Sequence, residues 1–298
     1  AVKRGTAFLL SLRRPDGSWP PRGQGPKDKQ YPVGPTALAV CALLQGGLRA
    51  SDPRMVEAMD WLAGQESRRT YTLALRCNVW MLAETQLPGR YRRNLLDDAR
   101  RLIHSTRDGS YGYDCRGDGR GGGCNSNSQF GLWGVYCAAQ AGVPVPSRYW
   151  PFVLRHWLTC QRSNGGWAYN QKDDVSATMT AAGLFGVCAC LDRMSRRSKD
   201  PRAVTTAAAW LEKHFTGAVR EGKYLGRGDV YYFLYAVARA QTVRGQARLG
   251  GIDWYEEGKE VLLKKQARDG SWDGKHGRLP ATSFALLFLT HGRTTVRE

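Results

Sequence analysis

A turn of the form Gln-x-x-x-Gly-x-Trp recurs along the whole chain, and it constrains the fold more than any other feature. Gln161 to Trp167 and Gln266 to Trp272 match this form fully, and Arg13 to Trp19 has arginine in place of glutamine. Weaker copies run from Ser105 to Tyr111 and from Gln65 to Tyr71, and a degenerate copy lies near 214–224. The copies are spaced by about 51 residues, which indicates that the chain repeats one structural unit.

Each turn joins two segments with helical periodicity, bounded by Pro and Gly residues that start or stop helices. The second segment of each pair is less polar and richer in small residues, whereas the first carries most of the arginines and lysines. The sequence therefore predicts six helical hairpins, with helices over 1–14, 35–44, 54–65, 72–84, 92–105, 126–141, 147–161, 176–191, 202–215, 229–241, 254–266 and 282–290.

Six hairpins of this size favour a closed all-α ring, an (α/α)6 toroid with inner and outer helices around a central cavity, over an open solenoid. The small residues predict that the inner helices approach one another closely. We expect one domain over 1–298, with repeats near 1–50, 51–88, 89–144, 145–198, 199–250 and 251–298.

The chain carries a formal net charge of +18. This charge favours an anionic partner such as a phosphate, a diphosphate, an acidic glycan or a lipid surface, or it is a well-solvated surface and no more. No segment has the pattern of the known nucleic-acid modules, so we expect no nucleic-acid partner. No apolar run is long enough to span a bilayer. Ala1 is not a methionine, and the sequence does not assign a compartment.

Six of the eight cysteines lie inside apolar helical patterns and are expected to be small buried residues. Cys115 and Cys124 flank a Gly/Arg loop, where they either form a disulfide or stay as free thiols.

The turns Asp16 to Trp19, Asn164 to Trp167 and Asp269 to Trp272, together with the period and the helix pairing, resemble those of the prenyltransferase and squalene-cyclase repeat proteins. The resemblance covers nearly the whole chain and implies a toroid whose cavity handles isoprenoids. In the family, this chemistry is acid-initiated cyclisation or prenyl transfer from a diphosphate. At 298 residues the chain resembles a single-domain, divergent member without a second barrel.

Two departures from the family concern its chemistry. The Asp-x-Asp-Asp acid of the cyclases is missing, and Asp173-Asp174 is the nearest pair. The zinc ligands of the protein prenyltransferases have no clear match either, because Asp114 and Cys115 are adjacent and neither His276 nor His291 stands in a matching place. We therefore expect no cofactor, although a cation in the loop from Asp114 to Gly123 stays open, and the sequence leaves open whether the protein is an enzyme.

In such a toroid, the junctions between the turns and the inner helices converge on one mouth of the cavity, which is the first place to expect a ligand. Six helix N-termini there also favour an anion. Helix capping explains the first polar residue of each helix, but not those on the following turn. The candidate ligand-binding residues are Asn125, Asn127, Gln129, Ser176, Thr178, Thr180, Tyr231, Tyr232, Tyr71 and Thr282.

Asp229 is the first candidate for a general acid, followed by Asp173 and Asp174, because an apolar cavity raises the pKa of a carboxyl group. The rings of Tyr71, Trp167, Tyr231 and Tyr232 could stabilise a carbocation, whereas the repeated tryptophans are more typical of packing between helices.

Three functional hypotheses follow from these observations. The first is a cavity that binds an isoprenoid or another elongated apolar, lipid-like small molecule with an anionic head, with terpene cyclase or prenyl transfer activity as its chemistry. The second is a lyase or hydrolase that acts on acidic polysaccharide, and the third is a non-catalytic binding or scaffold module. Contact with a membrane surface is compatible with the first.

Overall fold

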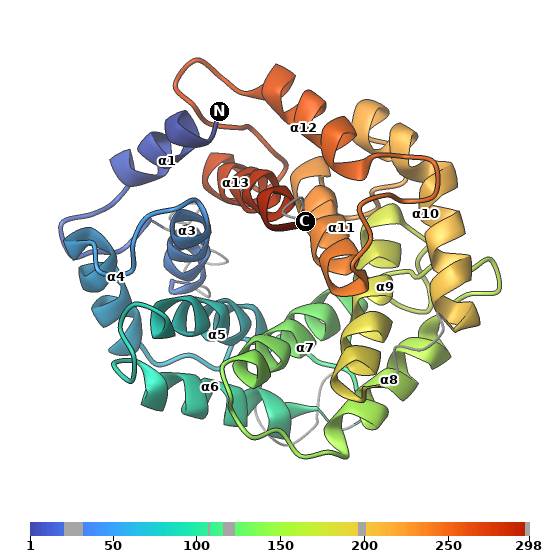
Figure 1. The fold of residues 1–298 in the computed structure, drawn as a ribbon, viewed down its shortest axis with the longest axis horizontal. Coiled ribbons are helices and arrows are strands. Elements are labelled where there is room, and N and C mark those ends of the chain that lie inside the picture. Colours follow the sequence, from blue (N-terminus) through green and yellow to red (C-terminus); the bar gives the residue numbers. More distant parts are fainter. Residues whose placement is uncertain (21–31, 107, 116–122, 196–200, 296–298) are drawn as a thin grey trace.

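The computed structural model describes residues 1–20, 32–106, 108–115, 123–195 and 201–295. Within these residues, twelve helices form two concentric rings, as Figure 1 shows and as the repeat predicts. The outer ring consists of α1 (Val2–Ser11), α4 (Pro53–Ala63), α6 (Arg92–Ser105), α8 (Tyr149–Cys160), α10 (Arg202–Glu221) and α12 (Trp254–Lys265). The inner ring consists of α3 (Gly34–Gln45), α5 (Thr70–Glu84), α7 (Asn125–Gln140), α9 (Ala177–Arg193), α11 (Val230–Arg244) and α13 (Arg278–Thr295).

The ring is closed by contacts between the two ends of the chain. Each inner helix packs against the inner helices on either side of it, and α13, the last, packs against α3, the first (Figure 1). The first outer helix, α1, also contacts α13. The predicted (α/α)6 toroid is therefore confirmed.

The repeated turn attaches the two layers to each other, and Trp167 shows how. Its backbone N–H donates to Thr180 Oγ1 on the inner helix α9 at 3.1 Å, and its indole Nε1–H donates to the carbonyl of Trp157 on the outer helix α8 at 2.9 Å. The ring is fully buried between these helices. One aromatic residue thus joins an outer helix, a turn and an inner helix.

The same bonds recur around the ring. The backbone N–H of the turn aromatic donates to a Ser or Thr hydroxyl in four repeats: Trp19 to Thr36 (2.9 Å), Tyr111 to Ser128 (3.0 Å), Trp167 to Thr180 (3.1 Å) and Trp272 to Thr282 (3.0 Å). A polar residue early in an inner helix therefore has a structural role that helix capping alone does not cover.

The glutamines of the motif connect one repeat to the next. Gln161 Nε2 donates to the carbonyls of Gly165 in its own turn and of Ala203 in the next outer helix, both at 2.8 Å. Gln266 makes the equivalent bonds to Gly270 (2.8 Å) and to Ala1 (3.0 Å), so the sixth repeat is joined to the start of the first.

The small residues of the inner helices mainly receive aromatic rings. A Cβ on Gly183 would lie 2.2 Å from the ring of Trp167, and one on Gly186 would lie 2.4 Å from the ring of Trp157. A Cβ on Gly134 would instead lie 2.7 Å from the Cα of Ala74 on the neighbouring inner helix and 2.6 Å from Leu102 Cδ1 on the outer helix α6. The expectation that small residues serve close contact between inner helices therefore holds at Gly134, whereas Gly183 and Gly186 accommodate tryptophans of the outer layer and the turn.

The largest differences from the predicted helix boundaries lie in the last two repeats. Helix α10 continues past Phe215 to Glu221, because Gly217 does not interrupt it and the chain stops at Gly222, which adopts a left-handed φ of 70°. Helix α13 begins at Arg278, four residues before Thr282, because Pro280 is tolerated within the first turn of a helix.

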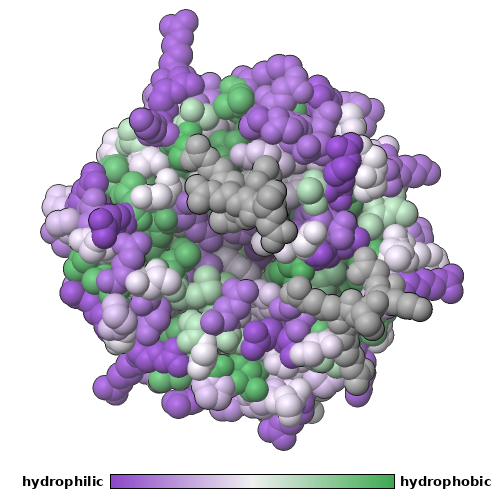
Figure 2. All heavy atoms as spheres, in the orientation of Figure 1, coloured by the Kyte–Doolittle hydropathy of each residue, from purple (hydrophilic) through white to green (hydrophobic). Residues whose placement is uncertain are grey.

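Cys115 and Cys124 are free thiols, so the disulfide alternative is wrong. Cys115 is buried with its Sγ 3.3 Å from Thr70 Oγ1, whereas Cys124 Sγ lies 3.2 Å from Ser126 Oγ. The described helices include none with the length and apolar character needed to cross a bilayer. Hydrophilic side chains cover most of the face shown in Figure 2, which is hollowed near its centre.

Candidate functional site

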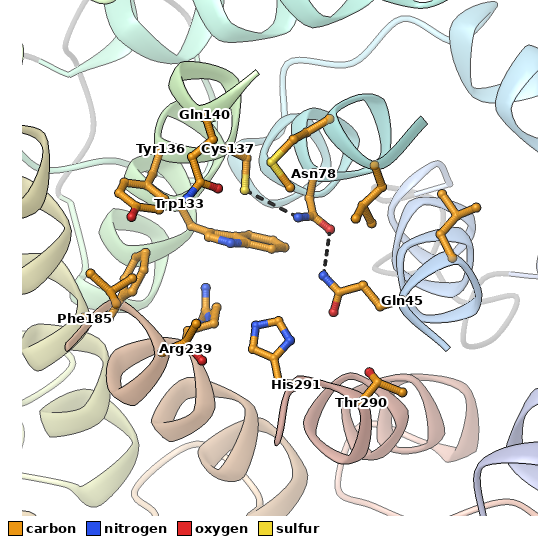
Figure 3. A pocket seen from close by; sticks show the side chains of 15 residues that line it. Gln45, Asn78, Trp133, Tyr136, Cys137, Gln140, Phe185, Arg239, Thr290 and His291 are labelled. Carbon is orange, nitrogen blue, oxygen red and sulfur yellow. Dashed lines mark hydrogen bonds between the residues drawn. The ribbon is translucent and has the colours of Figure 1, made fainter. Parts of the chain in front are cut away.

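A cavity of about 680 Å³ lies inside the inner ring, toward the C-terminal ends of its helices. All six inner helices contribute to its wall, and Figure 3 shows their side chains pointing into a common space. This volume lies within the range of about 300 to 1,000 Å³ that is usual for small-molecule sites. The wall is formed by Leu44, Gln45, Asn78, Met81, Leu82, Trp133, Tyr136, Cys137, Gln140, Phe185, Arg239, Thr242, Val243, Thr290 and His291.

Arg239 is the charged residue of this wall, and it is 2% exposed. Its guanidinium carbon lies 4.5 Å from the ring centroid of Tyr235 and 5.1 Å from that of Trp133. The rings of Phe130 and Phe185 lie at 5.2 Å, so four aromatic side chains surround one cation.

The guanidinium is only partly satisfied by hydrogen bonds. Nη2 donates to Gln129 Oε1 at 2.7 Å, whereas Nε and Nη1 have no partner among the described residues. A guanidinium keeps its charge inside a protein, and buried charges are normally paired. Each cation–π contact of a desolvated Arg is worth about 2 kcal/mol, which offsets only part of the cost of desolvation. Arg239 therefore holds unused positive charge and donor capacity at the cavity.

His291 contributes a neutral imidazole to the same wall. Burial, with a smaller contribution from the charge of Arg239, lowers its pKa from 6.5 to about 4. Its ring lies against that of Tyr235, with centroids 5.8 Å apart. At neutral pH the positive charge in the cavity is consequently that of Arg239.

Side-chain amides form the polar part of the wall. Asn78 Oδ1 accepts from Gln45 Nε2 at 3.4 Å, and Asn78 Nδ2 donates to Cys137 Sγ at 3.4 Å (Figure 3). Asn78 Oδ1 also accepts from Cys41 Sγ at 2.7 Å. Burial raises the pKa of the Cys137 thiol to about 12, so this thiol stays neutral. The wall is therefore mostly aromatic and aliphatic, with neutral polar groups and one cation.

A layer of buried side chains lies beyond Arg239, toward the N-terminal ends of the inner helices. Gln129 Nε2 on α7 donates to Tyr232 OH on α11. The aromatic ring centroids of Phe130 and Tyr232 are 6.0 Å apart. Tyr71 continues the layer with its ring 4.5 Å from that of Phe130. Three predicted binding residues, Tyr71, Gln129 and Tyr232, are thus brought together. They lie on one side of Arg239, and the cavity lies on the other.

The other predicted binding residues stand near the N-terminal ends of the inner helices and bond to the protein itself. Ser176 Oγ accepts from Met179 N (3.3 Å), and Thr178 Oγ1 donates to the carbonyl of Leu225 (3.0 Å). Tyr231 OH donates to the carbonyl of Asp273 at 2.9 Å. Thr180 and Thr282 accept from the turn tryptophans as described above.

Asn125 and Asn127 open α7 in different directions. Asn125 faces outward to α8, where its Oδ1 lies 3.0 Å from His156 Nε2. Asn127 Nδ2 donates to Cys124 Sγ at 3.1 Å, whereas Asn127 Oδ1 has no partner among the described residues. As ligand-binding residues, all ten remain predictions.

The three candidate acids are not among the residues that line the cavity. Asp229 caps α11, where its Oδ1 accepts from Tyr232 N at 3.0 Å. Asp173 forms an ion pair with Arg227 at 2.7 Å, and Asp174 is exposed.

The predicted binding residues lie in the N-terminal halves of the inner helices, whereas this cavity lies toward their C-terminal ends. Arg239 and His291, which line it, were not predicted as binding residues. One signal was available. Arg239 interrupts the apolar run from Val230 to Ala240, and an arginine in the middle of a buried helix marks either an ion pair or a site.

The described residues contain no group of three His, Cys, Asp or Glu side chains arranged to hold a metal ion. Asp114, from the loop considered for a cation, pairs with Arg69 at 2.6 Å, and Asp118 lies outside the described residues.

The sequence matches no protein-family model and no curated protein. Among solved structures, the chain is similar to the type II terpene cyclase MstE from Scytonema, with a TM-score of 0.61 and 13% identity over 99% of this chain and 96% of the other. It is also similar to a protein from Actinoplanes, with a TM-score of 0.58 and 18% identity over 99% of this chain and 98% of the other. These similarities show that the chain shares the fold of a terpene cyclase.

Proposed function

We propose that the central cavity binds an elongated apolar small molecule, of the isoprenoid class, whose anionic head pairs with Arg239. The observation that carries this proposal is the guanidinium itself, which is 2% exposed and has two nitrogens without a partner among the described residues. A carboxylate or diphosphate accepts hydrogen bonds from a guanidinium in the required geometry.

The walls fit the apolar part of such a molecule. Trp133, Phe185 and Leu44 provide aromatic and aliphatic surface on three different inner helices. The neutral His291 and the amides of Gln45 and Asn78 add hydrogen-bonding groups without a competing negative charge. The shared fold with a type II terpene cyclase supports the isoprenoid class.

Binding of geranylgeranyl diphosphate and of geranylgeraniol, measured by isothermal titration calorimetry, tests the proposal. The two ligands share the apolar chain and differ in the anionic head. A charged hydrogen bond contributes about 1.5 to 3 kcal/mol, so the diphosphate should bind roughly 10 to 100 times more tightly than the alcohol. Arg239→Gln should remove that difference.

The matched control is Arg93→Gln, which removes the same charge from an exposed position on α6, where the Arg93 side chain is 95% exposed. It should leave both affinities unchanged. No binding of either ligand, or equal binding of both by the native protein, would contradict the proposal.

Cyclisation or prenyl transfer would be a further step. Asp229, which caps α11 and does not line the cavity, remains the first candidate acid for it. Product analysis after incubation with geranylgeranyl diphosphate and with squalene tests this step. If a cyclic product forms, Asp229→Asn should abolish it, and an unchanged rate would remove Asp229 as the acid.

The polysaccharide hypothesis requires Arg, Tyr and His side chains across an open groove. Arg155, His156 and Tyr169 line one hollow outside the inner ring, and this set of side chains keeps an acidic polysaccharide as a second candidate ligand. Titration with oligogalacturonate distinguishes the two, because its affinity should not depend on Arg239.

A further inference from the structure

A second hollow, of about 810 Å³, lies outside the inner ring and shares no lining residue with the central cavity. Its wall combines the second half of α8, the start of α7 and the turns that precede α7 and α9. Three side chains on this wall, Cys160, His156 and Asn125, form a connected chain of hydrogen-bonding groups.

Asn125 is held in one orientation by two backbone carbonyls. Its own N–H donates to the carbonyl of Tyr169 at 2.9 Å, and its Nδ2 donates to the carbonyl of Ala168 at 2.8 Å. The amide atom that faces the carbonyl of Ala168 must be the nitrogen, because only the nitrogen can donate. The atom that faces His156 Nε2, at 3.0 Å, is therefore the oxygen Oδ1.

This orientation fixes the tautomer of His156. An amide oxygen only accepts, so the hydrogen of the neutral ring must lie on Nε2, and Nδ1 keeps its lone pair. Nδ1 lies 3.7 Å from Cys160 Sγ, because the two residues are four positions apart on the same face of α8. The thiol is therefore the donor, and His156 is placed to accept its proton.

The surroundings keep both groups neutral before any reaction. Burial raises the pKa of the Cys160 thiol, and the negative charge of Asp108 raises it further. Burial lowers the pKa of His156, against a smaller opposing effect of Asp108. A neutral thiol that donates to a neutral imidazole can attack only while it passes its proton to that imidazole, which is general-base catalysis.

The charge on the wall of this hollow is mainly positive. Arg155, Arg162 and Lys172 line it together with one carboxylate, that of Asp108. The wall therefore favours a reactant that carries negative charge.

We propose that Cys160 is an activated nucleophile that accepts an acyl group from an anionic acyl thioester, with His156 as the general base and Asn125 as a positioning residue. Sγ forms a bond to the carbonyl carbon, and its proton passes to His156 Nδ1. The bond from that carbon to the sulfur of the leaving thiol then breaks, and the leaving thiolate takes the proton from Nδ1. The products are S-acyl-Cys160, a free thiol and His156 in its original tautomer.

Acetyl coenzyme A, an anionic thioester, and S-acetyl-N-acetylcysteamine, an uncharged one, are suitable probes, with the modified cysteine identified by peptide mass spectrometry. The native protein should gain one acetyl group, on Cys160, and should react faster with acetyl coenzyme A. General-base catalysis contributes about 100-fold or more, so His156→Gln should slow acetylation of Cys160 by about that factor. Equal rates with the two thioesters would overturn the anionic part of the proposal.

Cys124 provides an internal reference, because it is the other described cysteine that is not buried. Acetylation of Cys124 at the rate of Cys160 would overturn the proposal, and this comparison needs no variant. Asn125→Asp keeps an acceptor for His156 Nε2 and should retain the reaction, whereas Asn125→Ala should lose it. If the rate is unaffected by His156→Gln in a protein with native helix content, the proposed role of His156 is wrong.

Discussion

Arg239 Nη2 donates to Gln129 Oε1 at 2.7 Å, and Gln129 in turn donates to Tyr232 OH in the layer that also contains Tyr71 and Phe130. Gln129 has no formal charge, so the bond orients the guanidinium without neutralising it. Because a hydrophobic residue would fill this position at lower cost, the arrangement favours a function for the charge over a role in stability.

The double variant Arg239→Met/Gln129→Leu should unfold at a higher urea concentration than the native protein. It removes a desolvated charge together with its acceptor, and replacing buried charged groups by apolar ones changes stability by about 0 to 4 kcal/mol in the favourable direction. The same variant should bind geranylgeranyl diphosphate no better than geranylgeraniol. A lower unfolding midpoint would mean that the arginine stabilises the fold.

His291 should make stability depend on pH between its folded pKa of about 4 and its ordinary value of 6.5. Because the unfolded chain binds the proton more readily, the contribution is complete above pH 6.5 and is lost as the pH falls toward 4. The difference between these two pKa values corresponds to a contribution of at most about 3 kcal/mol to the free energy of unfolding. We expect the free energy of unfolding, measured in urea across this pH range, to change less with pH for His291→Asn than for the native protein. Thr290→Val, at the neighbouring position, should keep the native pH dependence.

Thr180→Val should destabilise the fold by about 1 to 3 kcal/mol, because the buried N–H of Trp167 loses its acceptor. Thr180→Ser keeps the hydroxyl and should cost less than about 1 kcal/mol. Urea unfolding of the two variants separates the hydrogen bond from the packing of the methyl group. A loss for Thr180→Ser as large as or larger than that for Thr180→Val would contradict the prediction that the hydrogen bond outweighs the packing of the methyl group.

The architecture can be predicted from the sequence because each hairpin depends on a local motif that is repeated along the chain. Gln161, Gly165 and Trp167 make local bonds that recur in the other repeats, so the motif predicts the hairpins, and their number predicts the ring. The cavity does not follow in this way. Arg239 meets Trp133 and Phe185 only after α7, α9 and α11 have been placed side by side. In the sequence, these two residues precede Arg239 by 106 and 54 positions.

The polar residues at the start of the inner helices also show that the sequence does not reveal which groups a side chain meets in space. A threonine such as Thr180 looks like a ligand-binding residue in the sequence, because its partner, the backbone N–H of Trp167, is not visible there. Asn125 is a further case, since its partner His156 lies on the outer helix α8, 31 residues further along the chain. Sequence alone indicates that a residue has a polar partner, and the fold decides whether that partner belongs to the protein.

The buried ion pair between Arg76 and Asp98 fastens the second inner helix to the third outer helix. Arg76 Nε lies 2.9 Å from Asp98 Oδ2, which also accepts from Trp80 Nε1 at 2.9 Å, and the two charged side chains are 6% and 4% exposed. Asp98→Asn keeps the shape but leaves the guanidinium without its counter-charge, so the free energy of unfolding should fall by about 3 to 5 kcal/mol.

Asp97→Asn is the matched control, because Asp97 is about half exposed and its contacts with Arg93 and Arg100 are 4.0 and 3.6 Å long. It should change stability by less than about 1 kcal/mol, since exposed ion pairs contribute little. Urea unfolding of the two variants measures the difference, and similar losses would show that burial does not set the strength of the Arg76 pair.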